Sequence, residues 1–68
     1  MTEHPVINSS AISDVSYDRL SGELSVKFKD GSFYQYISVP LYEYTGFIAS
    51  VSMGRYFNQF IRNRYSTK

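Results

Sequence analysis

Arginines and tyrosines, rather than catalytic groups, are the residues of this sequence best suited to contact a ligand. The basic residues of the C-terminal segment are Arg55, Arg62, Arg64 and Lys68. All six acidic residues lie before position 52 beside only three basic ones, so residues 1–51 carry a net charge of −3 and residues 52–68 carry +4. A local excess of positive charge is typical of a surface that binds polyanions, although cations at the end of a helix also stabilise its dipole.

Aromatic side chains offer a second kind of contact. Seven Tyr and five Phe make up 18% of the sequence. Tyr34 and Tyr36 are separated by one residue, and Tyr56 lies near Asn58 in the basic segment. Aromatic rings stack on unpaired bases, and an amide can bond to a base edge. Each of these residues also has a structural explanation, because tyrosines pack in cores with the hydroxyl at the rim.

Catalytic and metal-binding chemistry find little support. The chain has no cysteine and a single histidine, His4, in a polar N-terminal stretch. A serine nucleophile would therefore lack its activating base, and no glycine-rich phosphate loop or cluster with metal-ligand spacing is present. We expect a protein that is not an enzyme, with no catalytic residues, no metal and no cofactor.

Targeting and membrane signals are also lacking. The N-terminus has no basic stretch followed by an apolar run, and the longest apolar runs are far shorter than the ~20 residues that span a bilayer. The sequence therefore predicts a cytoplasmic protein that does not contact membranes.

Alternating apolar and polar residues predict three strands that would position the tyrosines. They cover residues 11–17, 23–29 and 32–38, with turn residues at 18–22 and at Asp30-Gly31. Asp-Gly is a strong hairpin signal, because glycine adopts the positive φ that tight turns need. The strands are expected to form an antiparallel meander.

The period changes after Pro40 and predicts two helices. The apolar stripe of the first contains Leu41, Tyr44, Phe47, Ile48 and Val51. The second begins after Ser52 as N-cap and ends near Asn63. Its buried face is expected to contain Met53, Phe57, Phe60 and Ile61. On an α-helical wheel Arg55 and Arg62 lie about 20° apart on the opposite side. The fold class is thus α+β, a three-stranded meander followed by two helices packed on one sheet face.

The hairpin register decides which face the central tyrosines occupy. A two-residue turn pairs Phe28 with Phe33 and places Tyr34 and Tyr36 on the face away from the helices. A three-residue loop with Gly31 as the bulge glycine pairs Val26 with Tyr34 and directs both tyrosines into the core. We favour the bulged register, because it does not bury Gln35 beneath the helices.

The ordered set of motifs resembles the KTSC domain over about residues 9–65. The matching segments are Ser10-Ala11-Ile12, Tyr17-Asp18, Leu24-Ser25-Val26-Lys27-Phe28, Gly31, Tyr34-Gln35-Tyr36, Val39-Pro40, Ser52-Met53-Gly54-Arg55-Tyr56-Phe57-Asn58, Ile61-Arg62 and Tyr65. The family is named for its occurrence at the C-terminus of some lysyl-tRNA synthetases and also occurs as stand-alone small proteins. We expect a flexible N-terminal tail at 1–9, one KTSC-like domain at 10–65 and a C-terminal tail at 66–68.

The resemblance implies a small binding module, and its association with a tRNA synthetase implies a tRNA-like RNA as the partner. The residues expected to bind nucleic acid are Arg55, Arg62, Arg64, Lys68, Tyr34, Tyr36, Tyr56 and Asn58. The alternative is a module that binds another protein or itself, because a three-stranded sheet leaves open edges and one uncovered face.

Overall fold

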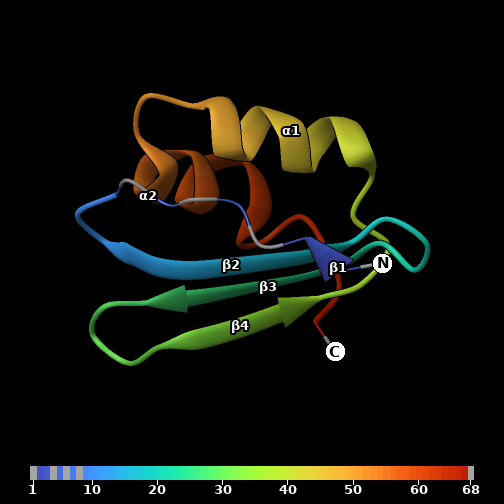
Figure 1. Cartoon of the computed structure of the whole chain (residues 1–68), viewed down its shortest axis with the longest axis horizontal. Coiled ribbons are helices and arrows are strands. Elements are labelled where there is room, and N and C mark those ends of the chain that lie inside the picture. Colours follow the sequence, from blue (N-terminus) through green and yellow to red (C-terminus); the bar gives the residue numbers. More distant parts are fainter. Residues whose placement is uncertain (1, 4, 6, 8, 68) are drawn as a thin grey trace.

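An antiparallel sheet and a helical layer over one of its faces form the structure (Figure 1). The computed structural model describes residues 2, 3, 5, 7 and 9–67. The strands lie in the order β1 (Thr2–Glu3), β2 (Ile12–Asp18), β3 (Glu23–Phe28) and β4 (Phe33–Tyr36). They are followed by α1 (Leu41–Ala49) and by a second helix made of α2 (Met53–Tyr56) and η1 (Phe57–Ile61). The predicted α+β architecture, with two helices on one sheet face, is confirmed.

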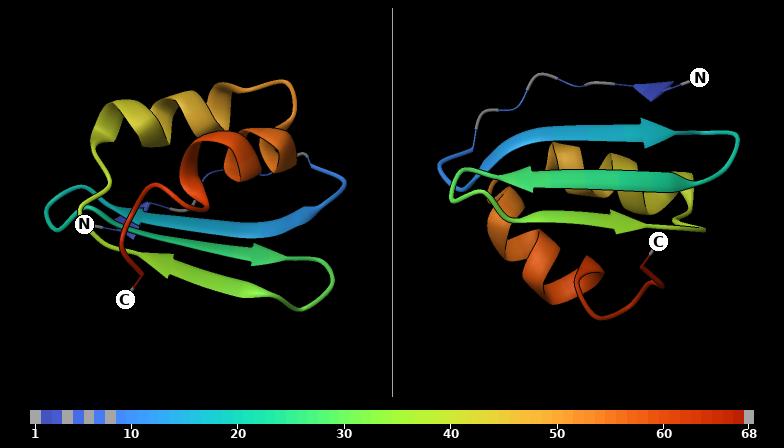
Figure 2. Two further views of the ribbon diagram at one scale, coloured as in Figure 1. Left: turned by 180° about the vertical axis from the view of Figure 1, so that it is seen from behind. Right: turned by 90° about the horizontal axis from the view of Figure 1, so that it is seen from below.

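Segments near both ends of the described chain pair with the sheet (Figure 2). β1 pairs with the end of β2 through Thr2↔Asp18, so the segment predicted as a tail contains a short edge strand. At the other edge Thr67 forms a bridge with Tyr36, and the Ser66 carbonyl accepts a hydrogen bond of 2.9 Å from the backbone N–H of Ile37. These contacts pair backbone groups that sheet edges otherwise leave open.

A β-bulge interrupts the predicted alternation of the first long strand. Ile12 pairs with Phe28 and Asp14 with Lys27, which leaves Ser13 as an extra residue. Ile12 and Val15 are therefore both buried, although strict alternation would place them on opposite faces.

The core lies between the sheet and the helices. Its buried apolar residues are Ile12, Val15, Tyr17, Leu24, Val26, Tyr36, Val39, Tyr44, Phe47, Met53, Phe57 and Ile61. Two members of the predicted α1 stripe are exposed instead. Leu41 occupies the first turn, and Val51 follows the end of the helix at Ala49, so a helical spacing that includes them overstated the buried face.

The second helix is not α-helical throughout. In η1 the Arg62 N–H donates to the Phe57 carbonyl at 2.8 Å, the i to i+5 bond of a π-helix. This wider turn buries Phe57 and Ile61 but leaves Phe60 40% exposed. The prediction that Phe60 belongs to the core was wrong, because it assumed 3.6 residues per turn.

Candidate nucleic-acid interface

A cleft of about 330 Å³ lies between the β3–β4 hairpin and η1. Its lining residues are Phe28, Asp30, Ser32, Tyr34, Phe57, Asn58 and Arg62. Three of the residues predicted to bind nucleic acid therefore converge here: Tyr34 from β4, Asn58 from η1 and Arg62 from the end of η1. We call this space the hairpin cleft.

The bulged turn of the hairpin places Tyr34 on the cleft side of the sheet. Phe28 donates its backbone N–H to Ser32 at 2.8 Å, and Gly31 donates to the Phe28 carbonyl at 3.1 Å with φ of 98°. Val26 consequently pairs with Tyr34, which confirms the favoured register. The positive φ is a conformation that glycine adopts without the steric cost of a Cβ.

Aromatic rings form the base of the hairpin cleft. The buried Phe57 ring lies 5.1 Å from Phe28 and 5.3 Å from Tyr34, measured between centroids. Phe28 and Tyr34 are themselves 5.7 Å apart and only half-buried. Part of each of these two rings therefore faces the cleft, where a planar apolar group can stack.

The polar wall of the cleft comes from the π-helical turn. Asn58 and Arg62 are both exposed, and Arg62 Nη1 donates to Asn58 Oδ1 at 3.4 Å. The Arg62 guanidinium carbon also lies 5.9 Å from the Tyr34 ring centroid, within range of a cation–π contact. A donor-rich cation is thus held beside an aromatic ring, an arrangement that can bond to a phosphate and stack on a base.

Tyr36 has a different role from the one predicted. Its side chain is only 1% exposed, and its hydroxyl donates to the Arg62 carbonyl at 3.2 Å. Burial is the main cause that raises its pKa above the usual value. The prediction that Tyr36 stacks on bases is therefore wrong for this conformation: the residue ties β4 to the end of η1.

Tyr56 faces α1 and lies away from the hairpin cleft. Its ring packs 5.9 Å from Phe47 and 4.8 Å from Phe60, and its hydroxyl donates to Glu43 Oε2 at 3.3 Å. Burial first, and then the Glu43 charge, raise the Tyr56 pKa. A Cβ on Gly46 would meet the Tyr56 hydroxyl at 2.6 Å. We call Glu43, Gly46 and Tyr56 the helix seam. Both the ring and the hydroxyl of Tyr56 are therefore used in contacts within the helical layer.

The remaining predicted residues either do not line the cleft or lie outside the described residues. Arg55 and Arg64 are exposed but are not among the lining residues of the hairpin cleft. The π-helical turn lies between Arg55 and Arg62, so the α-helical wheel that aligned them does not apply. Lys68 lies outside the described residues.

Asp30 and the two phenylalanines of the cleft were not among the predicted site residues. Asp30 accepts a hydrogen bond from the Ser32 N–H at 2.9 Å, and this bond is the main cause that lowers its pKa. The Asp30-Gly31 turn signal located the loop but gave no sign that the carboxylate would border the same cleft as Asn58.

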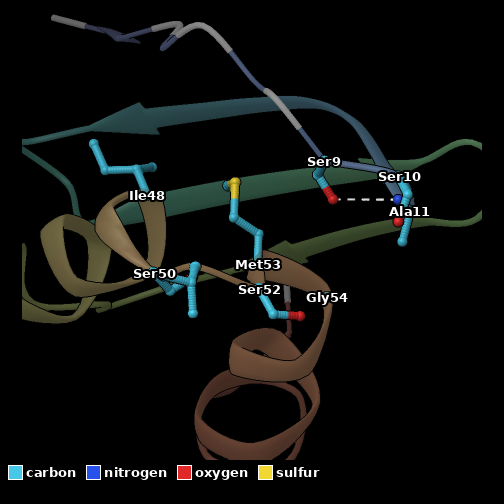
Figure 3. Close-up of a pocket in the computed structure, with 9 residues that line it drawn as sticks. Ser9, Ser10, Ala11, Ile48, Ser50, Ser52, Met53 and Gly54 are labelled. Carbon is cyan, nitrogen blue, oxygen red and sulfur yellow. Dashed lines mark hydrogen bonds between the residues drawn. The ribbon is translucent and has the colours of Figure 1, made fainter.

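A larger cavity of about 530 Å³ lies where the segment before β2 meets the end of α1 and the start of α2 (Figure 3). The lining residues are Ser9, Ser10, Ala11, Ile48, Ser50, Val51, Ser52, Met53 and Gly54. Ser9 Oγ already accepts hydrogen bonds from the N–H groups of Ala11 and Ile12, both at 3.2 Å. The lining includes neither a charged nor an aromatic side chain, so it offers less to a nucleic acid than the hairpin cleft does.

Metal and membrane sites are not found in the described part of the chain. Residues 2, 3, 5, 7 and 9–67 contain no group of three or more His, Asp or Glu side chains that could hold a metal ion. Among the same residues, each helix is too short or too polar to pass through a bilayer.

Comparison with known proteins relates nearly the whole chain to one family. The family model described as the KTSC domain matches residues 8–65. The crystal structure of a KTSC domain protein from Yersinia pestis superposes with a TM-score of 0.89 and 28% sequence identity, covering 100% of this chain and 96% of that one. No curated protein matches the chain significantly.

Proposed function

The chain belongs to the KTSC domain family, and we propose that it is a non-catalytic module that binds single-stranded RNA in the hairpin cleft. One unpaired base stacks on the exposed part of the Tyr34 ring and meets Phe28 edge-on, because the two rings are inclined by 82° to each other. Arg62 contacts the neighbouring phosphate or the face of the base. Specific binding of unpaired RNA commonly combines such stacking with arginine contacts.

The convergence of Tyr34, Asn58 and Arg62 is the observation that carries the proposal. An aromatic ring, an amide and a guanidinium from two distant segments line one cleft. The tyrosine and the arginine already contact each other, at 5.9 Å between guanidinium carbon and ring centroid. Packing of the core does not explain this arrangement, because Asn58 and Arg62 are exposed.

Charge supports the same location. The segment that contains η1 is the positively charged part of the chain, with +4 over residues 52–68. Arg55 lies before η1 in the sequence and Arg64 after it, and both side chains are exposed. We expect them to add positive charge for a bound strand. Contacts of Arg55, Arg62 and Arg64 with three phosphates would give a log–log salt slope of about −2 for single-stranded RNA.

An amide-shift titration with bulk tRNA and with a uridine pentamer tests the proposal. We expect shifts centred on the hairpin and η1, and an affinity that falls with salt. Tyr34→Leu should weaken binding of the pentamer about tenfold, whereas Tyr42→Leu, which changes a tyrosine that is 74% exposed on α1, should not. Shifts absent at moderate salt, or equal losses in both variants, would refute binding at this cleft.

A second candidate function is self-association through the sheet face away from the helices. Phe33 and Ile37 are 56% and 38% exposed there, and apolar side chains that share one exposed sheet face can form an interaction surface. Light scattering at micromolar concentration tests it: a dimer in the native protein that becomes a monomer in Phe33→Ser supports this function, and a monomeric native protein contradicts it.

A further inference from the structure

The Asp30 carboxylate is an unexpected group in a cleft suited to a polyanion. It lines the hairpin cleft together with Arg62 and Asn58. Its oxygen accepts the Ser32 N–H at 2.9 Å, and this bond favours the ionised form by lowering the pKa. An ionised carboxylate only accepts hydrogen bonds, and it repels phosphates. The groups of RNA that it can bind are therefore donors, which are the N–H groups of a base and the ribose 2′-OH; only the base N–H groups differ from one base to another.

Asn58 presents the opposite hydrogen-bonding character to the same cleft. Its Oδ1 accepts a hydrogen bond from Arg62 Nη1, which orients the amide. The two N–H donors on its nitrogen remain for a ligand. The cleft therefore combines amide donors with two carboxylate acceptors, and Asp30 retains further lone pairs on both oxygens beside the bond to Ser32.

Guanine matches this combination of groups better than the other bases. Its Watson–Crick edge carries an acceptor, O6, followed by two adjacent donors, N1–H and N2–H. Adenine offers a donor beside an acceptor, and so does cytosine. Uracil offers one donor between two acceptors. A carboxylate that receives two parallel N–H bonds therefore distinguishes guanine from the other three bases.

We propose that the hairpin cleft selects guanine, with Asp30 accepting from N1–H and N2–H and Asn58 donating to O6. The base stacks on the half-buried ring of Tyr34 and contacts the nearly perpendicular ring of Phe28 edge-on. The cleft volume of about 330 Å³ lies at the lower end of the range for small-molecule sites and suits one base rather than several. This inference rests on the RNA-binding function proposed above.

The test compares uridine pentamers that carry guanosine, adenosine, cytidine, inosine or uridine at the centre. We expect the guanosine pentamer to bind about tenfold more tightly than the uridine pentamer in fluorescence anisotropy. Inosine lacks the N2 amino group, so its pentamer should fall between the two.

Asp30→Asn isolates the carboxylate. The asparagine keeps an oxygen for the Ser32 N–H, so the turn is retained, but its amide nitrogen opposes a guanine donor. We expect the guanosine preference to disappear, so that the variant binds the guanosine and uridine pentamers with affinities within about twofold of each other. The matched control is Asp14→Asn, which removes the same charge at an exposed position of β2 and should keep the preference.

The outcomes separate this inference from the general function. Equal binding of all five pentamers, or a preference that survives Asp30→Asn, overturns guanine selection and leaves RNA binding in place. No binding of any pentamer overturns both.

Discussion

The hairpin cleft and the helix seam are both built around a tyrosine beside a polar side chain, and they differ in what that pair leaves accessible. In the seam, the Tyr56 hydroxyl donates to the buried Glu43, which is 9% exposed, and the ring fills the space above Gly46. In the cleft, Tyr34 is half-buried beside the exposed Arg62. The same residue type therefore stabilises the fold in one place and presents a surface in the other.

Phe57 connects the two regions, and its removal should have the largest effect. Its ring contacts Phe28 and Tyr34 on one side and Phe47 on the other. Phe57→Ala should cost about 3–5 kcal/mol, which equals the stability that a core of this size supplies. We expect the variant to lose its dispersed amide spectrum.

Phe33→Ala is the matched control for this substitution. Phe33 is 56% exposed on the other sheet face, so its truncation should cost less than about 1 kcal/mol. A Phe57→Ala protein that unfolds in urea as late as Phe33→Ala would contradict a shared core beneath cleft and seam.

Sequence reasoning located the three long strands because their signals are local. The alternation of β3 and the Asp30-Gly31 turn each lie within a few residues. They left two registers open, and the cost of burying Gln35 favoured the observed pairing of Val26 with Tyr34. The bulge at Ser13 and the π-helical turn carry no such signal. Both depend on how the segment packs, and the second moved Phe60 out of the core.

Prediction of the candidate site from the sequence meets the same limit. Tyr34, Asn58 and Arg62 were identified by residue type, but the chain gave no reason to separate them from Tyr36 and Tyr56. That separation depends on which hydroxyl finds a buried acceptor, the Arg62 carbonyl in one case and Glu43 in the other. Such partners lie 13 or 26 residues away in sequence, so they follow from tertiary packing alone.

A double-mutant cycle on Gly46 and Tyr56 should measure how strongly these two residues of the seam interact. Gly46→Ala places a methyl group 2.6 Å from the Tyr56 hydroxyl, and we expect a loss of about 1–3 kcal/mol. In a Tyr56→Phe background this oxygen is gone, so the same substitution should cost at least about 1 kcal/mol less. Urea unfolding of the four proteins measures the coupling.

RNA binding by the same variant provides the control for this cycle. Under conditions in which it is folded, the Gly46→Ala protein should bind the uridine pentamer like the native protein, because the seam lies outside the hairpin cleft. Additive losses in the cycle would show that the hydroxyl and the glycine are not in contact.

Arginine substitutions compare the cleft with its surroundings. Arg62→Gln removes the charge beside Tyr34 and should weaken pentamer binding about tenfold and flatten the salt slope by about 0.7. Arg55→Gln removes an exposed charge that does not line the cleft, so it should flatten the slope similarly with a smaller loss of affinity. Equal losses would indicate diffuse attraction without a cleft.

The smallest effect concerns alkaline pH and separates the seam from the rest of the fold. Burial raises the pKa of Tyr36, Tyr56 and Tyr65 above the usual value near 10, and the Glu43 charge raises Tyr56 further. The folded state thus retains these protons more tightly than the unfolded state. This contribution to stability is complete below about pH 10 and is lost as the pH rises through the folded-state pKa values. Urea unfolding at about pH 9, 10 and 11 should show a fall in stability that is shallower in Tyr56→Phe. Stability that rises over this interval, or an identical slope in the variant, would mean that the Tyr56 proton is not held by the seam.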